Sequence, residues 1–299
     1  MSAAEPPRAL TEALLRARDG ELTGALRLTG PPEALVHLSA GRVTAVTTPA
    51  APTPETLLVR SGAVPAGVWA DAYEAAAHTD SMARELLSRG AVSAAVLELA
   101  CATALADGAL ALCLSPEPRV EAVLADAAPP LLGLEHGLDP REVLAEAVRR
   151  LAFLTDRWGS PAELARRRPA PAGPVHDSLP SAYRLLLTQA NGRRTPRDLA
   201  FALGRGLTGV MADVARLTER GLLEAAAPDG ADGLTRRTPE RPARDEGPSA
   251  LAKRRPGSNA VRSAPPASPV PVPGSVRERL RSLGADHGTA EAGAGGKAG

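Results

Sequence analysis

Three short runs near the N-terminus alternate apolar and polar residues and so predict β-strands. They are "GALRLT" (24–29), "ALVHLS" (34–39) and "RVTAVTT" (42–48), and a period of two is typical of half-buried strands. The turn sequences "GPPE" and "AGR" between them favour an antiparallel meander. Apolar residues at helical spacing within residues 10–16 predict an amphipathic helix before the meander. Most of the buried surface of the strands is expected from Leu26, Leu28, Leu35, Val43 and Val46.

Two stretches of the next segment repeat one design. "LLVRSGAVPAGVW" (57–69) is matched by "LLSRGAVSAAVL" (86–97). Each copy has the end of a helix, a glycine suited to a left-handed C-cap, and a Pro or Ser that opens the next helix. We therefore expect two helical hairpins within one domain. We interpret "ADGALALCLSPE" (106–117) as a further strand or short hairpin, and "LDPREVLAEAVRRLAFL" (138–154) as a helix capped by Asp139.

The apolar pattern after residue 178 predicts three helices and a closing strand. The first helix covers residues 181–189, the second runs from its cap at Thr195 to Leu203, and the third covers residues 208–220. A tight turn at Arg205-Gly206 would join the last two, and "RGLLEAA" would open a wing. This order is similar to that of winged-helix regulators of the MarR type. The resemblance implies a helix-turn-helix fold with DNA as a partner.

The chain therefore divides into four predicted parts, and the fold class is α+β. Residues 1–156 form a helix, a meander and helical hairpins. Residues 157–177 allow a short helix, but they contain "RPAPAGP", which is typical of a linker. Residues 178–227 form the winged helix-turn-helix. Residues 228–299 are basic in part, rich in Pro and Gly and without aromatic residues. Because this last part cannot bury enough apolar area to offset backbone ordering, we expect it to be disordered. The exception is "SVRERLRSL" (275–283), whose apolar spacing allows a helix.

Composition limits what the chain binds and where it works. The net charge of +1 gives no overall field that would favour nucleic acid or membrane. Lys253 and Lys297 are the only lysines and isoleucine does not occur, a bias that indicates a GC-rich bacterial genome and supplies arginines without functional need. Two free cysteines and no recognisable secretory signal predict a cytoplasmic protein. No apolar run reaches the roughly 18 residues that a membrane span needs.

The first half resembles the PATAN domain family, a bacterial domain of unknown function. The resemblance rests on "LTEALLRARDG", "ELTGALRL", "VHLSAGRVTAVTT", the paired "GAV" hairpins and the closing "LAEAVRRLAFL". The hairpins also resemble the N-terminal modules of type II secretion ATPases. PATAN domains look like signalling adaptors that occur beside response regulators, small Ras-like GTPases and roadblock-type proteins. The resemblance implies a protein partner of this kind and no catalytic residues.

Few residues of the third predicted helix have the chemistry to read DNA bases. Base reading requires Arg, Lys, Asn, Gln or hydroxyl groups near the N-terminus of that helix. The positions that we expect to be exposed there are Thr208, Gly209, Met211, Ala212, Asp213 and Arg216. Other arginines, around the second helix and the turn, could contact phosphates, although a solvated face is the alternative interpretation. The predicted DNA-binding residues are Arg193, Arg194, Arg197, Arg205, Thr208 and Arg216.

Enzymatic signals are missing from the sequence. The five histidines are isolated, no glycine-rich loop could cradle a phosphate, and no Ser or Cys lies in a nucleophile motif. We therefore predict neither catalysis nor a metal or cofactor site.

Two hypotheses about the function remain. The first is a winged-helix transcriptional regulator with a PATAN-like partner-binding domain, and the second is a signalling adaptor that does not bind DNA and works with a small Ras-like GTPase and a roadblock-type protein.

Overall fold

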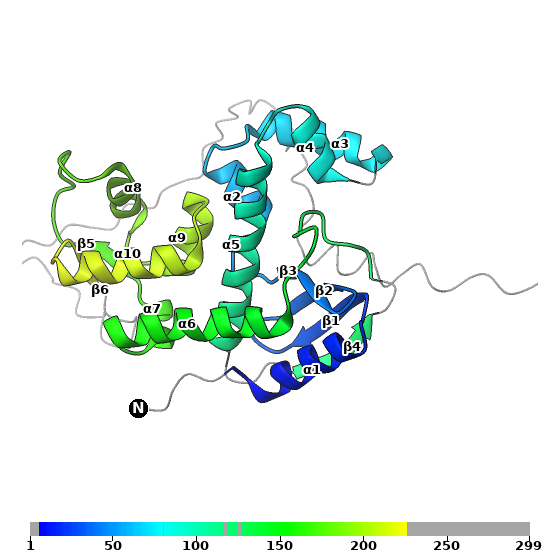
Figure 1. Cartoon of the computed structure of the whole chain (residues 1–299). Helices are drawn as coiled ribbons and strands as arrows, with labels where there is room; N and C mark the ends of the chain where they lie inside the picture. The colour runs from blue at the N-terminus through cyan, green and yellow to red at the C-terminus, as the bar shows by residue number, and fades with distance from the viewer. Residues whose placement is uncertain (1–5, 80, 116–118, 125–126, 226–299) are drawn as a thin grey trace, which may run out of the picture. The chain divides into compact units, whose positions relative to one another are not determined.

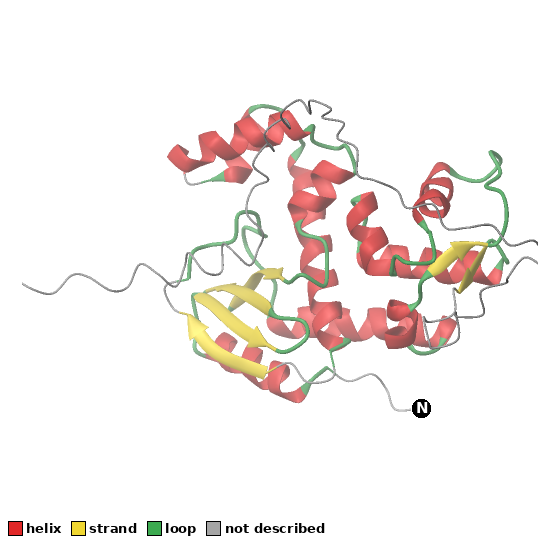
Figure 2. Ribbon diagram, turned by 180° about the vertical axis from the view of Figure 1, so that it is seen from behind, coloured by secondary structure: helices red, strands yellow, loops and turns green. Residues whose placement is uncertain are grey.

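The computed structural model describes residues 6–79, 81–115, 119–124 and 127–225. Within these residues the protein has an α+β fold, with ten helices, a four-stranded antiparallel sheet and a two-stranded one (Figure 1, Figure 2). The predicted fold class is confirmed. The predicted disordered tail lies outside the described residues.

The four-stranded sheet contains the predicted meander and one strand that was not predicted. Strands β1 (Gly24–Thr29), β2 (Ala34–Ser39) and β3 (Arg42–Thr47) pair antiparallel in chain order. Strand β4 (Arg119–Leu124) adds to the free side of β1, so the order is β3-β2-β1-β4. Gly41 has φ +73° in the turn before β3, and an added Cβ would lie 2.7 Å from the carbonyl oxygen of Arg18.

One face of this sheet packs against three helices: α1 (Arg8–Asp19), α5 (Ala94–Cys113) and α6 (Pro140–Trp158). Four of the five predicted core residues are buried, but Leu35 is only half-buried. Directly opposite residues of an antiparallel pair share a face, and Val36 lies opposite the buried Leu26. Leu35 therefore points to the other face of the sheet, and Val36 and Leu38 take the core positions that we expected it to share.

The predicted helical repeat is confirmed. Helices α2 (Pro54–Arg60) and α3 (Ala66–Thr79) form the first copy, and α4 (Met82–Ser88) and α5 (Ala94–Cys113) form the second. The glycine that follows the first helix of each copy has a positive φ. Side chains of serine or threonine cap the N-termini of three of these helices.

The expected strand or hairpin at residues 106–117 is wrong, because α5 continues through this stretch to Cys113. The helix is buried on all sides between Ala104 and Leu112. A helix that is apolar all round shows no 3.6-residue period, so its sequence resembles a buried strand. By length and composition α5 would also suit a membrane span, and 67% of that window is buried within the protein. A buried core helix meets the same criteria.

Helix α5 lies very close to the sheet at one glycine. A Cβ on Gly108 would lie 2.8 Å from both Cβ and Cγ1 of Val46 on β3. A glycine inside a helix costs about 1 kcal/mol relative to alanine. Helix stability therefore does not favour glycine here, and the close contact with Val46 explains it.

Helix α6 (Pro140–Trp158) begins as the sequence predicts. Asp139 and Glu142 form a reciprocal capping box around Pro140. The Asp139 carboxylate also accepts a hydrogen bond of 2.7 Å from Nε of Arg18. This ion pair ties the end of α1 to the start of α6.

The helix-turn-helix elements follow the prediction closely. Helix α8 (Ser181–Gln189) has the expected bounds, α9 (Pro196–Leu203) begins after a capping box at Thr195, and α10 (Leu207–Glu219) ends one residue before the expected position. Strand β6 (Leu223–Ala225) follows α10 at the start of the expected wing.

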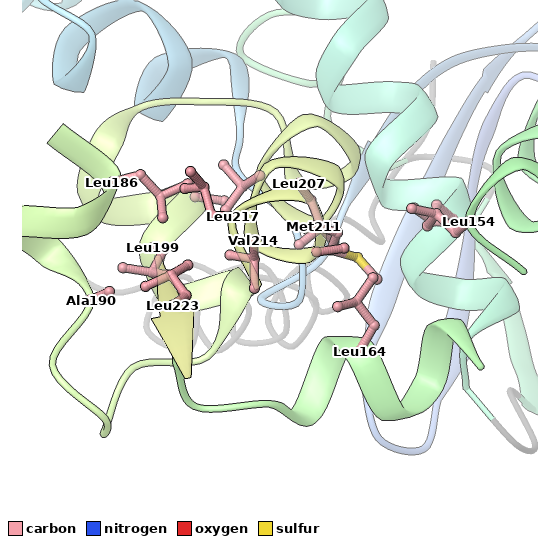
Figure 3. Close-up of a cluster of buried hydrophobic side chains, with 14 of the residues drawn as sticks. Leu154, Leu164, Leu186, Ala190, Leu199, Leu207, Met211, Val214, Leu217 and Leu223 are labelled. Atoms are coloured by element: carbon pink, nitrogen blue, oxygen red, sulfur yellow. The ribbon is translucent and has the colours of Figure 1, made fainter. Parts of the chain in front are cut away.

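The predicted linker contains regular structure that packs against both halves. It includes helix α7 (Pro161–Arg166) and strand β5 (Pro169–Pro171), and β5 pairs antiparallel with β6. Leu164 of α7 belongs to a buried cluster with Leu154 of α6 and Met211 of α10 (Figure 3). The boundaries between the proposed domains stay a prediction, but the described residues on either side of them share this core.

Two helical glycines are expected to respond oppositely to alanine. Gly108→Ala should lower the free energy of unfolding by about 1–3 kcal/mol, because the new methyl group has no space beside Val46. Gly209→Ala should raise it by about 0.5–1 kcal/mol, because no atom lies within 4 Å of the new Cβ and alanine favours a helix. Urea denaturation of both variants checks this, and equal effects would contradict the packing described at Val46.

A second prediction concerns His37, which is 7% exposed on β2. Burial lowers the pKa of its imidazole to about 4, from 6.5. The unfolded chain therefore binds more protons between pH 6.5 and pH 4, and the free energy of unfolding should fall through this window as the pH falls. The full loss is about 3 kcal/mol by conversion of the pKa difference. His37→Gln should flatten this slope in urea titrations at several pH values, whereas the exposed control His78→Gln should leave it unchanged.

Candidate functional site

The N-terminus of α10 is held by a carboxylate from the centre of α5. Asp107 is 1% exposed. Its Oδ2 accepts a hydrogen bond of 2.6 Å from the backbone N–H of Leu207, and its Oδ1 accepts bonds of 3.2 Å and 2.6 Å from the backbone N–H and the hydroxyl of Thr208. These are the first two residues of α10, the third helix of the predicted helix-turn-helix.

Arg150 of α6 completes the contact. Its Nη1 donates to Oδ1 of Asp107 at 2.8 Å and to the Thr208 hydroxyl at 3.1 Å. Its Nε donates to Glu146 at 2.7 Å. The buried carboxylate is therefore both paired with a cation and fully hydrogen-bonded, which are the conditions under which a buried charge is tolerated.

Asp107 does for α10 what an N-cap side chain ordinarily does. The residue at the N-cap position is Gly206, which has no side chain to accept a hydrogen bond. The acceptor comes instead from a residue about a hundred positions earlier in the chain, and its negative charge lies at the positive end of the helix dipole. A Cβ on Gly206 would lie 2.9 Å from Oδ2 of Asp107, so the glycine makes the approach possible.

The other glycine of the turn packs against the first half as well. Gly204 ends α9 with φ +61°, in the left-handed region. A Cβ on Gly204 would collide with the backbone of Arg60 and Ser61 at the end of α2. Both glycines of "GRG" therefore press the turn of the helix-turn-helix against helices of the N-terminal half.

The outward face that we expected on α10 is largely buried. Met211, Ala212 and Asp213 are 0%, 5% and 6% exposed, so the expectation that these three positions are exposed is wrong. Two layers cover the helix: α8 and α9 on the helix-turn-helix side, and α5, α6 and α7 on the other. The sequence pattern showed only the stripe of Val210, Val214 and Leu217 that faces the first layer.

Two of the six predicted DNA-binding residues are ion-paired to one buried carboxylate. Nη2 of Arg205 lies 2.5 Å from Oδ2 of Asp213, and Nη1 of Arg216 lies 3.2 Å from Oδ1 of the same residue. Thr208 has its hydroxyl and N–H hydrogen-bonded to Asp107. These three side chains are thus part of the internal structure around α10.

The remaining three arginines lie at the start of α9. Arg194 donates to the backbone and side-chain oxygens of Gln189, and Arg197 pairs with Asp198 at 3.3 Å. Arg193 is exposed, and its guanidinium has no hydrogen-bond or ion-pair partner among the described residues. The structure therefore gathers these three residues in one short segment, apart in their contacts from Arg205 and Arg216.

Sequence reasoning missed Asp107 and Arg150. One signal was present in each region: Asp107 interrupts an otherwise apolar run, and the third helix begins after a glycine without any capping side chain. Neither signal shows that Asp107 contacts the start of the third helix.

A small void with an apolar lining lies inside the N-terminal half. A void of about 10 Å³ lies among apolar side chains of α1, β2, β3, α5 and α6, and this is about the space of one water molecule. Cys113 borders it as a free thiol, and burial raises the pKa of that thiol to about 11. The described residues contain no group of three or more His, Cys, Asp or Glu side chains that could hold a metal ion.

The Asp107 contact should contribute strongly to stability. Asp107→Ala is expected to lower the free energy of unfolding by about 3 kcal/mol, because it leaves the Arg150 charge and two helix N–H groups without their acceptor. Asp71→Ala, at an exposed position of α3, is the matched control and should change it by less than about 0.5 kcal/mol. A double-mutant cycle of Asp107→Asn with Thr208→Val, read by urea denaturation, should give a coupling energy of about 0.5–3 kcal/mol. Additive effects would contradict the contact.

Comparison with known proteins adds no relative. No family model, no curated protein and no solved structure matches the chain. The resemblances to PATAN domains and to MarR-type regulators stay predictions, and the functional argument rests on the geometry around α10.

Proposed function

We propose that this chain is a bacterial signalling adaptor whose helix-turn-helix is a structural part that does not read DNA bases. The observation that carries the proposal is the Asp107 carboxylate at the N-terminus of α10. A reading helix must present that end to the major groove. Here the end is buried against α5 and α6, and a carboxylate already holds the place where an anionic phosphate would bind.

Charges around α10 support the same proposal. Asp213 is buried and faces both Arg205 and Arg216, so part of their positive charge is neutralised within the protein. The chain as a whole carries a net charge of only +1. Phosphate contacts dominate the affinity of DNA-binding proteins, and the described surface of α10 contributes few groups for them.

The proposed partner is a protein. The PATAN-like character of the first half implies a small Ras-like GTPase, a roadblock-type protein or a response regulator. The structure adds one relevant feature: the core formed by both halves leaves the helix-turn-helix fixed on the adaptor-like half, so the two would present one continuous surface. The positive test of the adaptor uses a purified protein of one of these three classes that is encoded beside this chain. We expect the two proteins to form a stable complex.

Contact with DNA phosphates is the second candidate function. It is favoured by the exposed Arg193, which has no partner among the described residues, and by the neighbouring Arg194 and Arg197. This segment does not depend on the buried N-terminus of α10. Such binding would be weak in sequence preference, because phosphates carry no sequence information.

Salt dependence separates the two candidates. For the adaptor, we expect no saturable binding of a GC-rich duplex in fluorescence anisotropy, even at low salt. Binding through Arg193, Arg194 and Arg197 would instead give log K falling with log salt at a slope of about −0.9 per phosphate contact. The triple alanine variant would remove that slope, and a matched triple alanine variant at Arg8, Arg141 and Arg149, arginines of α1 and α6, would retain it. This second result would overturn the adaptor proposal in favour of a DNA-binding regulator.

A further inference from the structure

Two of the chain's six aromatic residues lie beside arginines at one side of the helix-turn-helix. The whole sequence has two Trp, two Tyr and two Phe. The guanidinium carbons of Arg157 and Arg216 lie 6.0 Å and 5.7 Å from the ring centroid of Trp158. That of Arg220 lies 5.9 Å from the ring of Tyr183. We call these five residues the arginine–aromatic row.

Helix α10 makes the row continuous. Arg216 and Arg220 are four residues apart at the end of this helix, so their side chains lie on the same face. Arg216 lies over a ring from the end of α6, and Arg220 over a ring from α8. Phe153 of α6 flanks the row, since its ring meets Trp158 edge-on at 5.5 Å and is 46% exposed.

Coding bias does not explain this arrangement. A GC-rich genome supplies arginines throughout the chain, but it does not place two of the six aromatic residues beside three of them. Trp, Tyr and Arg are also the residue types that dominate the binding energy of protein interfaces. The row therefore has the composition of an interface and not only of a solvated helix face.

The row carries unneutralised positive charge. Arg157 and Arg220 have no carboxylate partner among the described residues. Arg216 shares Asp213 with Arg205, which leaves two cations for one anion. The N–H groups of Arg157 and Arg220 have no carboxylate bonded to them among the described residues, and a guanidinium matches a carboxylate in shape and charge.

We propose that the arginine–aromatic row binds an acidic segment of a partner protein, with the exposed ring of Phe153 contacting an apolar side chain of that segment. The proposal rests on the adaptor function and names the surface it uses. Two guanidiniums and the ring of Phe153 lie around the ring of Trp158, which favours an acidic ligand at this ring over a stacked nucleic-acid base. Three arginines are also fewer than the 6–10 phosphate contacts typical of strong DNA binding.

The test uses the full chain with Trp69→Phe as background, because Trp158 is then the only tryptophan and reports binding at the row. The probe is a short synthetic peptide of Glu and Asp with one Leu. A matched peptide has Gln and Asn in place of the acids. We expect the acidic peptide alone to change the Trp158 emission saturably. Arg157→Gln and Arg220→Gln should each weaken its binding about tenfold, the loss of a charge-assisted hydrogen bond.

Controls make the outcomes decisive. Arg149→Gln changes the net charge equally on an arginine of α6 that pairs with Glu146, and it should leave peptide binding unchanged. Thermal unfolding confirms that each variant is folded. Equal binding of the two peptides, or equal weakening by Arg149→Gln, would overturn the proposal. Preference for a single-stranded oligonucleotide over the acidic peptide would assign the row to nucleic acid instead. Binding of duplex DNA that depends on Arg193 and not on Arg157 would refute the adaptor function while leaving this surface to be judged by the peptide result.

Discussion

The position of the helix-turn-helix half depends on one buried carboxylate. Asp107 stands in the middle of the central helix α5, accepts hydrogen bonds from the first turn of α10, and is paired with Arg150 of α6. A buried charge of this kind is tolerated only when all of its partners are present. Asp107 therefore links the three helices α5, α6 and α10 at one point, beside the apolar core that they share. Its neighbour Gly108 fixes the same helix against the sheet.

This contact changes the meaning of a familiar fold. A helix-turn-helix is recognised by its helices and its turn, and these features are present here. Its use in reading DNA requires in addition that the N-terminus of the last helix is free. That requirement concerns what the rest of the chain does with the helix end, so the fold alone does not decide the function.

The sequence was informative wherever the determining interactions are local. The alternation of strands β1 to β3, the capping boxes at Asp139 and Thr195 and the repeated hairpin glycines all act within a few residues, and the structure has them as expected. Two elements were missed because their causes are distant in sequence. Strand β4 exists through its pairing with β1, and the second half of α5 is apolar on every side. The prediction of exposed positions on α10 was wrong for the same reason. Met211 and Asp213 are buried by helices that are distant in sequence, which the local pattern does not show.

The two glycines of the turn have a consequence for how this chain can be divided. Gly204 packs closely against the end of α2, and Gly206 packs closely against the Asp107 carboxylate. A chain cut between residues 157 and 177 would leave one fragment with Asp107 paired to Arg150 but without its hydrogen-bond donors from α10, and the other with an uncapped helix and two glycines facing water. The helix-turn-helix here is not an interchangeable module. A replacement taken from another protein would need glycine at both positions of the turn that contact the first half.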